Sequence, residues 1–159
     1  MTPNVTIAMP DPQKKGTQLA TFQVAHLYFG VDVLRVQEVL QFHHMTRVPQ
    51  APEVIEGLIN LRGQIVPAID MRRRLQLPPR AATDTPVNMV VRTSEGAISL
   101  LVDGIGDVVD VEESSYERPP DNLAPYARDL IRGVYKLSNS LLLVLDTERT
   151  VDLTIRRPG

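Results

Sequence analysis

The chain of 159 residues contains no cysteine. A disulfide framework, a thiolate metal site and a cysteine nucleophile are therefore excluded, and the composition is typical of a protein from a reducing cytosol. No apolar run approaches the ~20 residues that a helix needs to span a bilayer. The N-terminus also lacks the charged-then-apolar layout of a signal peptide, so we expect a cytoplasmic protein.

The sequence has little excess charge and few aromatic residues. Its formal net charge is −2, which provides no strong overall attraction to nucleic acid or to a membrane surface. Three Phe and four Tyr, with no ladder of aromatic residues among the basic ones, give little support for nucleic-acid binding. We therefore expect neither a nucleic-acid partner nor direct insertion into a membrane.

Recognisable catalytic and metal-binding patterns are also missing. Neighbouring residues on a strand point to opposite faces, so His43 and His44 would not converge on one ligand, and His26 is far from both in the sequence. The serines do not form a Gly-x-Ser-x-Gly elbow, and there is no phosphate-binding glycine loop. Asp103 and Asp107 are interpreted as ending a strand or facing water, because perturbed acids need a cleft. We expect no catalytic residue, no metal and no cofactor.

What the sequence does contain is a series of short apolar runs with alternating polarity. Examples are QLATFQVA (18–25) and SLLLVLD (140–146), and such runs separated by Gly, Asn, Ser and Pro predict strands. Thirteen prolines argue against long helices. Only 71–77, 126–131 and a stretch after Asp146 are expected to be helical. The pattern predicts an all-β barrel or sandwich with a few short helices.

One of these runs occurs twice. IEGLINLRGQIVPAID (55–70) aligns without a gap on IRGVYKLSNSLLLVLD (131–146), a shift of 76 positions. Arg-Gly at 62–63 falls on Ser-Asn at 138–139, and Gly and Asn are the residues that tolerate positive φ in a tight hairpin turn. Each copy is therefore predicted to be a β-hairpin with its tip at these positions. Each ends at an aspartate that can cap a short helix.

A second similarity extends the repeat. FGVDVLRVQEV (29–39) resembles LLVDGIGDVV (100–109), and Phe29 and Leu100 are 71 positions apart. We therefore predict two similar small β-barrels between a flexible N-terminal tail and a C-terminal tail, with the boundaries 1–16, 17–83, 84–152 and 153–159.

The first copy differs from the second in ways that suggest function. Pro67 replaces Leu143, and because proline cannot donate to a ladder, its strand should be an edge or carry a bulge there. Arg62 has Ser138 as its counterpart. The arginine run 72–74 follows the predicted cap and fits either a partner contact or a solvated helix.

Charge is distributed unevenly between the two predicted barrels. MRRRLQLPPR is basic, whereas Asp103, Asp107 and Asp110 give the second barrel an acidic side. Such complementary edges would steer encounters with partners.

The segment GLINLRGQIVPAIDMRRRL closely resembles the signature of the CheW family, the adaptor proteins of bacterial chemosensory arrays. The resemblance extends in order over residues 18–152, through FGVDVLRVQEVL and LIRGVYKLSNSLLLVLDTERTV. It implies two SH3-like five-stranded β-barrels packed together. It also implies a non-enzymatic scaffold that couples the cytoplasmic tip of methyl-accepting chemoreceptors to the regulatory domain of the chemotaxis histidine kinase. Such a protein would be cytoplasmic and recruited to membrane-bound receptor arrays.

The resemblance also implies where partners bind. Receptor-facing positions of the family, in a groove between the barrels, match Val31, Leu34, Val36, Glu38, Arg62 and Val108. On residue type alone, the first three of these would belong to a core rather than to a contact surface. Arg62 is expected to bond a carboxylate or backbone carbonyl of the receptor, or to be held in place by Glu38.

The resemblance assigns no kinase contact to a single residue and favours the second barrel for this contact. An adaptor of a related pathway, such as surface sensing, twitching or second-messenger control, is the alternative.

Overall fold

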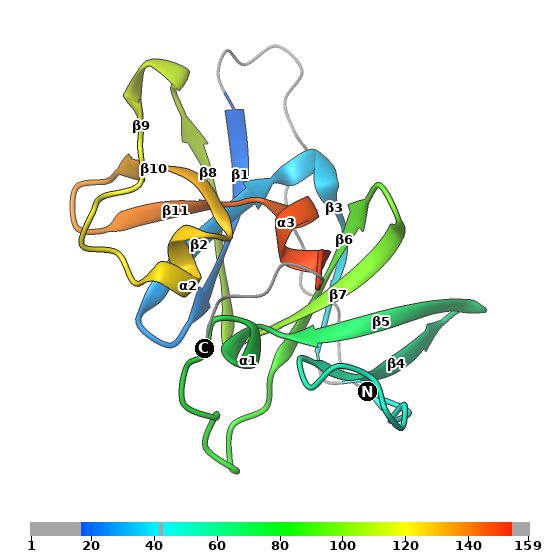
Figure 1. Cartoon of the computed structure of the whole chain (residues 1–159). Coiled ribbons are helices and arrows are strands. Elements are labelled where there is room, and N and C mark those ends of the chain that lie inside the picture. The colour runs from blue at the N-terminus through cyan, green and yellow to red at the C-terminus, as the bar shows by residue number, and fades with distance from the viewer. Residues whose placement is uncertain (1–16, 42, 154–159) are drawn as a thin grey trace.

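The computed structural model describes residues 17–41 and 43–153 (Figure 1). The tails predicted at 1–16 and 153–159 lie outside these residues, apart from Leu153. The described chain forms two β-sheets with short helices between strands, so the predicted all-β class is confirmed.

The first sheet has six strands in the order β8-β1-β2-β11-β10-β9. Their bounds are β1 (Thr17–Val24), β2 (Leu27–Asp32), β8 (Gly104–Val111), β9 (Tyr116–Glu117), β10 (Ile131–Lys136) and β11 (Leu141–Leu145). The second sheet has five strands in the order β3-β6-β7-β5-β4. Their bounds are β3 (Val36–Leu40), β4 (Ile55–Leu61), β5 (Gln64–Asp70), β6 (Val87–Thr93) and β7 (Gly96–Val102).

The helices are short, as the prolines predicted. The α-helices are α1 (Met71–Arg74), α2 (Pro125–Arg128) and α3 (Thr147–Val151), and two 3-10 turns are η1 (Val33–Arg35) and η2 (Glu113–Ser115). In the described part of the chain, no helix has the length and apolar character needed to cross a membrane.

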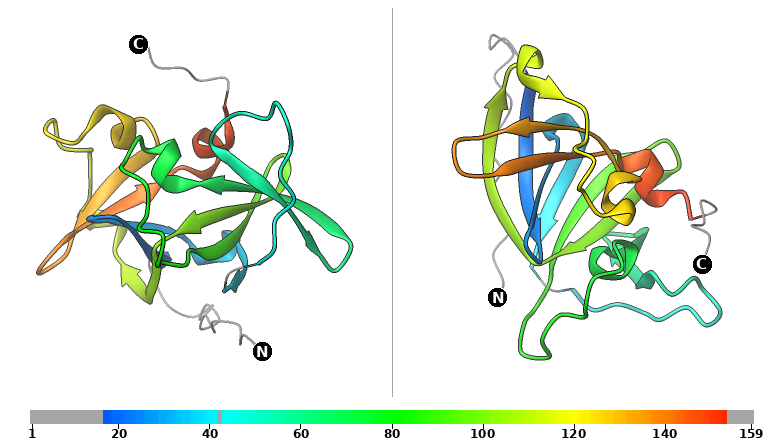
Figure 2. Two further views of the ribbon diagram at one scale, coloured as in Figure 1. Left: turned by 90° about the horizontal axis from the view of Figure 1, so that it is seen from below. Right: turned by 60° about the vertical axis from the view of Figure 1, so that its left-hand side comes forward.

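The two sheets exchange strands between the halves of the chain (Figures 1 and 2). β1 and β2 pair with β8 and β11 of the second half, whereas β3 pairs with β6. The predicted boundary between 17–83 and 84–152 is therefore wrong, although the repeat is real. The physical reason lies in the connections: η1 leads from β2 into the other sheet, and Asp103 alone separates β7 from β8.

Buried residues form one central cluster and two smaller ones. The central cluster combines side chains of both sheets, among them Phe22 and Phe29, whose rings stack at 5.4 Å, and Met89 and Leu100. A second cluster draws on all five strands of the second sheet, from Leu40 on β3 to Ile59 on β4. A third lies on β1, β8, β10 and β11 of the first sheet. Each sheet thus curls around a core of its own, and the two pack across the central one, as expected for paired barrels.

The repeated hairpin has the same register in both copies. Ile55 pairs with Ile69, and 76 positions later Ile131 pairs with Leu145; in each copy the register then shifts at the glycine. Both capping aspartates also behave alike, because each carboxylate accepts a backbone N–H of the helix that follows. The predicted hairpins and caps are confirmed.

The two hairpin tips differ in backbone conformation. Arg62 has φ 52° and Gly63 φ 88°, as a tight turn of the predicted kind requires. Ser138 and Asn139 occupy the same place in the register but do not adopt positive φ. The predicted turn conformation is therefore wrong for the second tip, because Asn tolerates positive φ without imposing it.

Pro67 occupies a position where β5 has a partner on one side. It lies opposite Leu58 of β4, and the parallel pairing of β5 with β7 begins at the next residue, Ala68. β5 is an interior strand of its sheet, but at Pro67 it is locally an edge. The missing N–H therefore leaves no gap in a ladder.

Candidate partner-binding site

The turn η1 presents an apolar side chain to solvent. Leu34 has 68% of its surface exposed, while Val33 beside it is buried in the central core. The N–H of Leu34 donates to the carboxylate of Asp32 over 2.9 Å, which caps the turn. The exposed leucine thus stands on an anchored turn, at the point where the chain passes from one sheet to the other.

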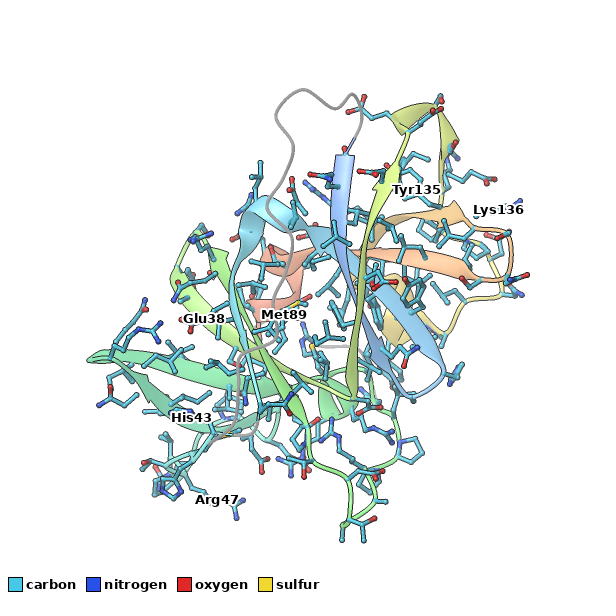
Figure 3. The ribbon with its side chains drawn as sticks, turned by 180° about the vertical axis from the view of Figure 1, so that it is seen from behind. Glu38, His43, Arg47, Met89, Tyr135 and Lys136 are labelled. Atoms are coloured by element: carbon cyan, nitrogen blue, oxygen red, sulfur yellow. The ribbon has the colours of Figure 1, made fainter. Side chains whose placement is uncertain are left out.

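Two half-buried valines flank the central core from opposite sheets. Val36 begins β3 and Val108 lies on β8, and both pack against the central cluster. β3 and β8 are edge strands of their sheets. Figure 3 shows the molecule from behind, with its side chains drawn as sticks. Both strands therefore offer apolar surface at the boundary between the barrels.

Arg62 and Glu38 form an ion pair across the second sheet. The side chain of Arg62 is 70% exposed and that of Glu38 is 15% exposed. Gln37 adds hydrogen bonds to Glu38 and to Gln64, each over 3.3 Å. Because β3 and β4 are the two edges of this sheet, the network links the hairpin tip to the opposite edge and closes the barrel. Glu38 therefore holds Arg62, whose guanidinium still faces solvent.

Val31 does not belong to this surface. Its exposure is 1%, and it packs in the central core, so a direct partner contact is wrong for this residue. The reason is strand alternation: Val31 and Phe29 of β2 share the face that points into the core. The preference for a core position is right for Val31 and wrong for Leu34.

The structure thus brings four of the six predicted residues close to one another. Leu34, Val36 and Glu38 follow one another in one segment, and Arg62 joins them through Glu38. Val108 is related to them through the apolar core. The assignments of the other five residues to a receptor remain predictions.

Two residues of the same surface were not predicted. Nη1 of Arg92 donates to the carbonyl oxygens of Leu34 and Val36, over 3.1 and 3.3 Å. These partners lie more than fifty positions away in the sequence, so no local pattern indicates them. Ile65 is 57% exposed next to the hairpin tip. Its alternation with buried Val66 is a signal that the sequence did contain.

The arginines of the run bind partners within the chain. Arg72 binds the carboxylate of Asp103, with 2.7 Å between Nη2 and Oδ2, and Arg80 binds the same carboxylate over 2.9 Å. Burial alone would raise the pKa of Asp103. The hydrogen bonds from Arg72, from the N–H of Ala25 and from Arg80 outweigh burial, so its pKa lies below the usual value.

The other two arginines are also engaged. Arg73 pairs with Glu56 over 2.8 Å, and Arg74 donates to three carbonyl oxygens at the end of α3. The interpretation as a solvated helix is therefore wrong for the half-buried Arg72 and Arg74, whereas Arg73 is exposed. Since Asp103 is neutralised by arginines of the same chain, it does not contribute to an acidic edge that steers partners.

The histidines and carboxylates form no metal site in the part of the chain that the structure describes, where no group of three or more potential ligands converges. Asp103 ends β7, as expected, and belongs to the arginine cluster.

Comparisons with known proteins agree with this architecture. Residues 18–154 match the family model of the CheW-like domain. Chemotaxis protein CheW of Bacillus subtilis is 31% identical over 139 residues, which cover 87% of this chain and 89% of that protein. Chemotaxis protein CheW of Klebsiella aerogenes is 28% identical over 134 residues, covering 84% and 81%. The crystal structure of the scaffolding protein TtCheW from Thermoanaerobacter tengcongensis is similar at a TM-score of 0.75 and 28% identity, covering 82% of this chain and 89% of that one.

Proposed function

Because this chain belongs to the family of CheW-like domains, we propose that it is a non-enzymatic adaptor that couples methyl-accepting chemoreceptors to the chemotaxis histidine kinase. Its relatives are named chemotaxis proteins, which favours this pathway over a related one. The adaptor is cytoplasmic and is recruited to membrane-bound receptor arrays. It needs no cofactor, metal or nucleic acid.

The observation that carries the proposal is the exposed segment from Leu34 to Glu38, joined to Arg62 by the ion pair. The receptor tip is a helical hairpin, and helices bind to such surfaces through an apolar stripe. Leu34, Val36 and Val108 supply apolar contacts. Arg62 donates charge-assisted hydrogen bonds to a carboxylate or a backbone carbonyl of the receptor.

The kinase regulatory domain binds elsewhere on this chain. We assign this contact to the barrel of the six-stranded sheet, which carries the second hairpin, and to no single residue. A separate kinase surface leaves the receptor site accessible, and simultaneous binding is what coupling requires.

The test is binding of purified receptor cytoplasmic fragment and kinase regulatory domain to wild type and to Leu34→Asp. A charge in the contact should weaken receptor binding at least about tenfold, the equivalent of 1.4 kcal/mol. Kinase binding and the melting temperature should stay unchanged, because most of the surface of Leu34 is exposed in the folded protein. Val48→Asp, at another exposed apolar residue, is the matched control.

Two outcomes would contradict the proposal at different levels. If wild type binds neither partner, the adaptor function is wrong. If Leu34→Asp binds the receptor as tightly as wild type does, the function stands and the site is wrong.

A further inference from the structure

We propose that Arg92 is a positioning residue that holds the η1 turn in the shape that presents Leu34 and Val36 to the receptor. The inference rests on the proposed function, because it concerns the same surface. Arg92 lies on β6 beside Val91, which pairs with Val36 of β3. Its side chain is exposed and reaches from there over the turn.

One acceptor of Arg92, the carbonyl of Leu34, lies within the 3-10 turn, and the other, the carbonyl of Val36, lies at the start of β3. A 3-10 turn of three residues forms few hydrogen bonds of its own, and the last carbonyls of a helix have no partner within it. Within η1, the N–H of Val36 donates to the carbonyl of Val33. Nη1 of Arg92 serves the carbonyls of Leu34 and Val36, on either side of Arg35. It thereby fixes the backbone directly at the two apolar contact residues.

A second contact from the same side supports this arrangement. Arg35 lies 3.6 Å from the carboxylate of Glu148, and that carboxylate accepts the backbone N–H of Ser94. Ser94 follows Arg92 by two positions, at the turn between β6 and β7. The end of β6 and the turn after it therefore hold this segment by two routes. One runs through the carbonyls of Leu34 and Val36, and the other runs through the side chain of Arg35.

The effect of Arg92 on binding arises from order in the free protein. A turn that is already fixed loses less conformational freedom when the receptor helix binds than a loose turn does. Without Arg92 the turn remains attached through Asp32 and Arg35 but becomes more mobile at Leu34 and Val36. We expect Arg92→Met to weaken receptor binding by about fivefold, a loss of ordering rather than of contact.

Both hydrogen bonds come from one nitrogen, which makes a sharp rescue available. Lysine also ends in a single nitrogen with several donors, so Arg92→Lys should keep most of the receptor affinity. Arg132→Met is the matched control, because it makes the same chemical change at an exposed arginine of the other sheet. It should leave the turn and the receptor affinity unchanged.

The decisive measurement is amide hydrogen exchange at Leu34 and Val36 in the free protein, read beside the affinities for receptor fragment and kinase regulatory domain. Arg92→Met should accelerate exchange at these two amides several-fold, weaken receptor binding, and leave kinase binding and the melting temperature in place. Unchanged exchange would overturn the proposal even if receptor binding fell, because Arg92 would then act as a direct contact. Faster exchange with full receptor affinity would also overturn it. Wild type that binds no receptor fragment would instead refute the proposed function, while the exchange rates still test whether Arg92 orders the turn.

Discussion

The tip of the first hairpin carries an arginine where its backbone favours another residue. Arg62 and Gly63 both have positive φ, and the turn with this property prefers Asn followed by Gly. Replacing Arg62 by Asn should therefore relieve the backbone while removing the guanidinium. Replacing it by Ala removes the guanidinium but leaves an unsuitable residue at positive φ.

The two opposing contributions are similar in size. Holding a residue other than Gly, Asn or Asp at left-handed φ costs about 1 kcal/mol. An exposed ion pair contributes ~0.2–1 kcal/mol, and the pair with Glu38 belongs near the upper end because Glu38 is only 15% exposed. We expect Arg62→Asn to leave the free energy of unfolding nearly unchanged. Arg62→Ala should lower it by about 1 kcal/mol, which is the value of the lost pair.

Urea unfolding of wild type and both variants measures these differences as shifts of the midpoint at constant slope. Receptor binding, measured in parallel, should fall equally for both variants, since both lose the same charged donor. If Arg62→Asn is no more stable than Arg62→Ala, the backbone argument is wrong. If Arg62→Asn binds the receptor as well as wild type does, Arg62 is not a receptor contact.

Three further tests, one of them with a control variant, address other parts of the structure. Asp103→Asn should cost about 2 kcal/mol at neutral pH, and because the folded state lowers the pKa of Asp103, the difference from wild type should shrink as pH falls below about 4 in urea titrations at several pH values. Gly57→Ala would place a Cβ 2.8 Å from the carbonyl oxygen of Thr46 and should lower stability by about 2 kcal/mol, whereas Gly104→Ala, with its nearest atom at 3.8 Å, should be neutral in the same melting experiment. Arg74→Met removes the hydrogen bonds to the carbonyls at the end of α3 and should cost about 2 kcal/mol without changing receptor affinity; an unchanged melting temperature would contradict this role.

The hairpins were predictable because their signals are local. Alternating apolar residues, a glycine at the tip and an aspartate at the strand end all act within a few positions of one another. The same reasoning explains the error at the second tip. Asn139 permits a positive φ, but the conformation of a turn is decided by the strands that it joins.

The exchange of strands was not predictable from the sequence. Whether β3 pairs with β2 or with β6 is a choice between two tertiary arrangements, and the periodicity of β3 is the same in both. The arginine run illustrates the same limit. Arg74 binds the carbonyl of Thr150, which lies 76 positions away, and a run of like charges carries no record of such acceptors.

For the candidate site, the sequence indicated a segment that the structure exposes and one residue that the structure buries. Leu34 and Glu38 are exposed or paired where the resemblance placed them, while Val31 faces the core. No sequence pattern indicates Arg92, because its hydrogen bonds reach two backbone carbonyls more than fifty positions away and depend on no feature of its own neighbourhood.

The exchanged strands determine how the molecule can move. The chain crosses between the barrels after β2 and again after β7. An ion pair lies at each crossing: Arg35 pairs with Glu148 at the first, and Asp103 pairs with Arg72 at the second. A hinge between the barrels would have to separate the central cluster of buried side chains, to which both sheets contribute. Bending is therefore opposed by the packing of this shared core as well as by the two ion pairs. Such a body keeps two bound partners at a fixed distance and angle, so a displacement imposed on one of them is passed to the other instead of being absorbed between them.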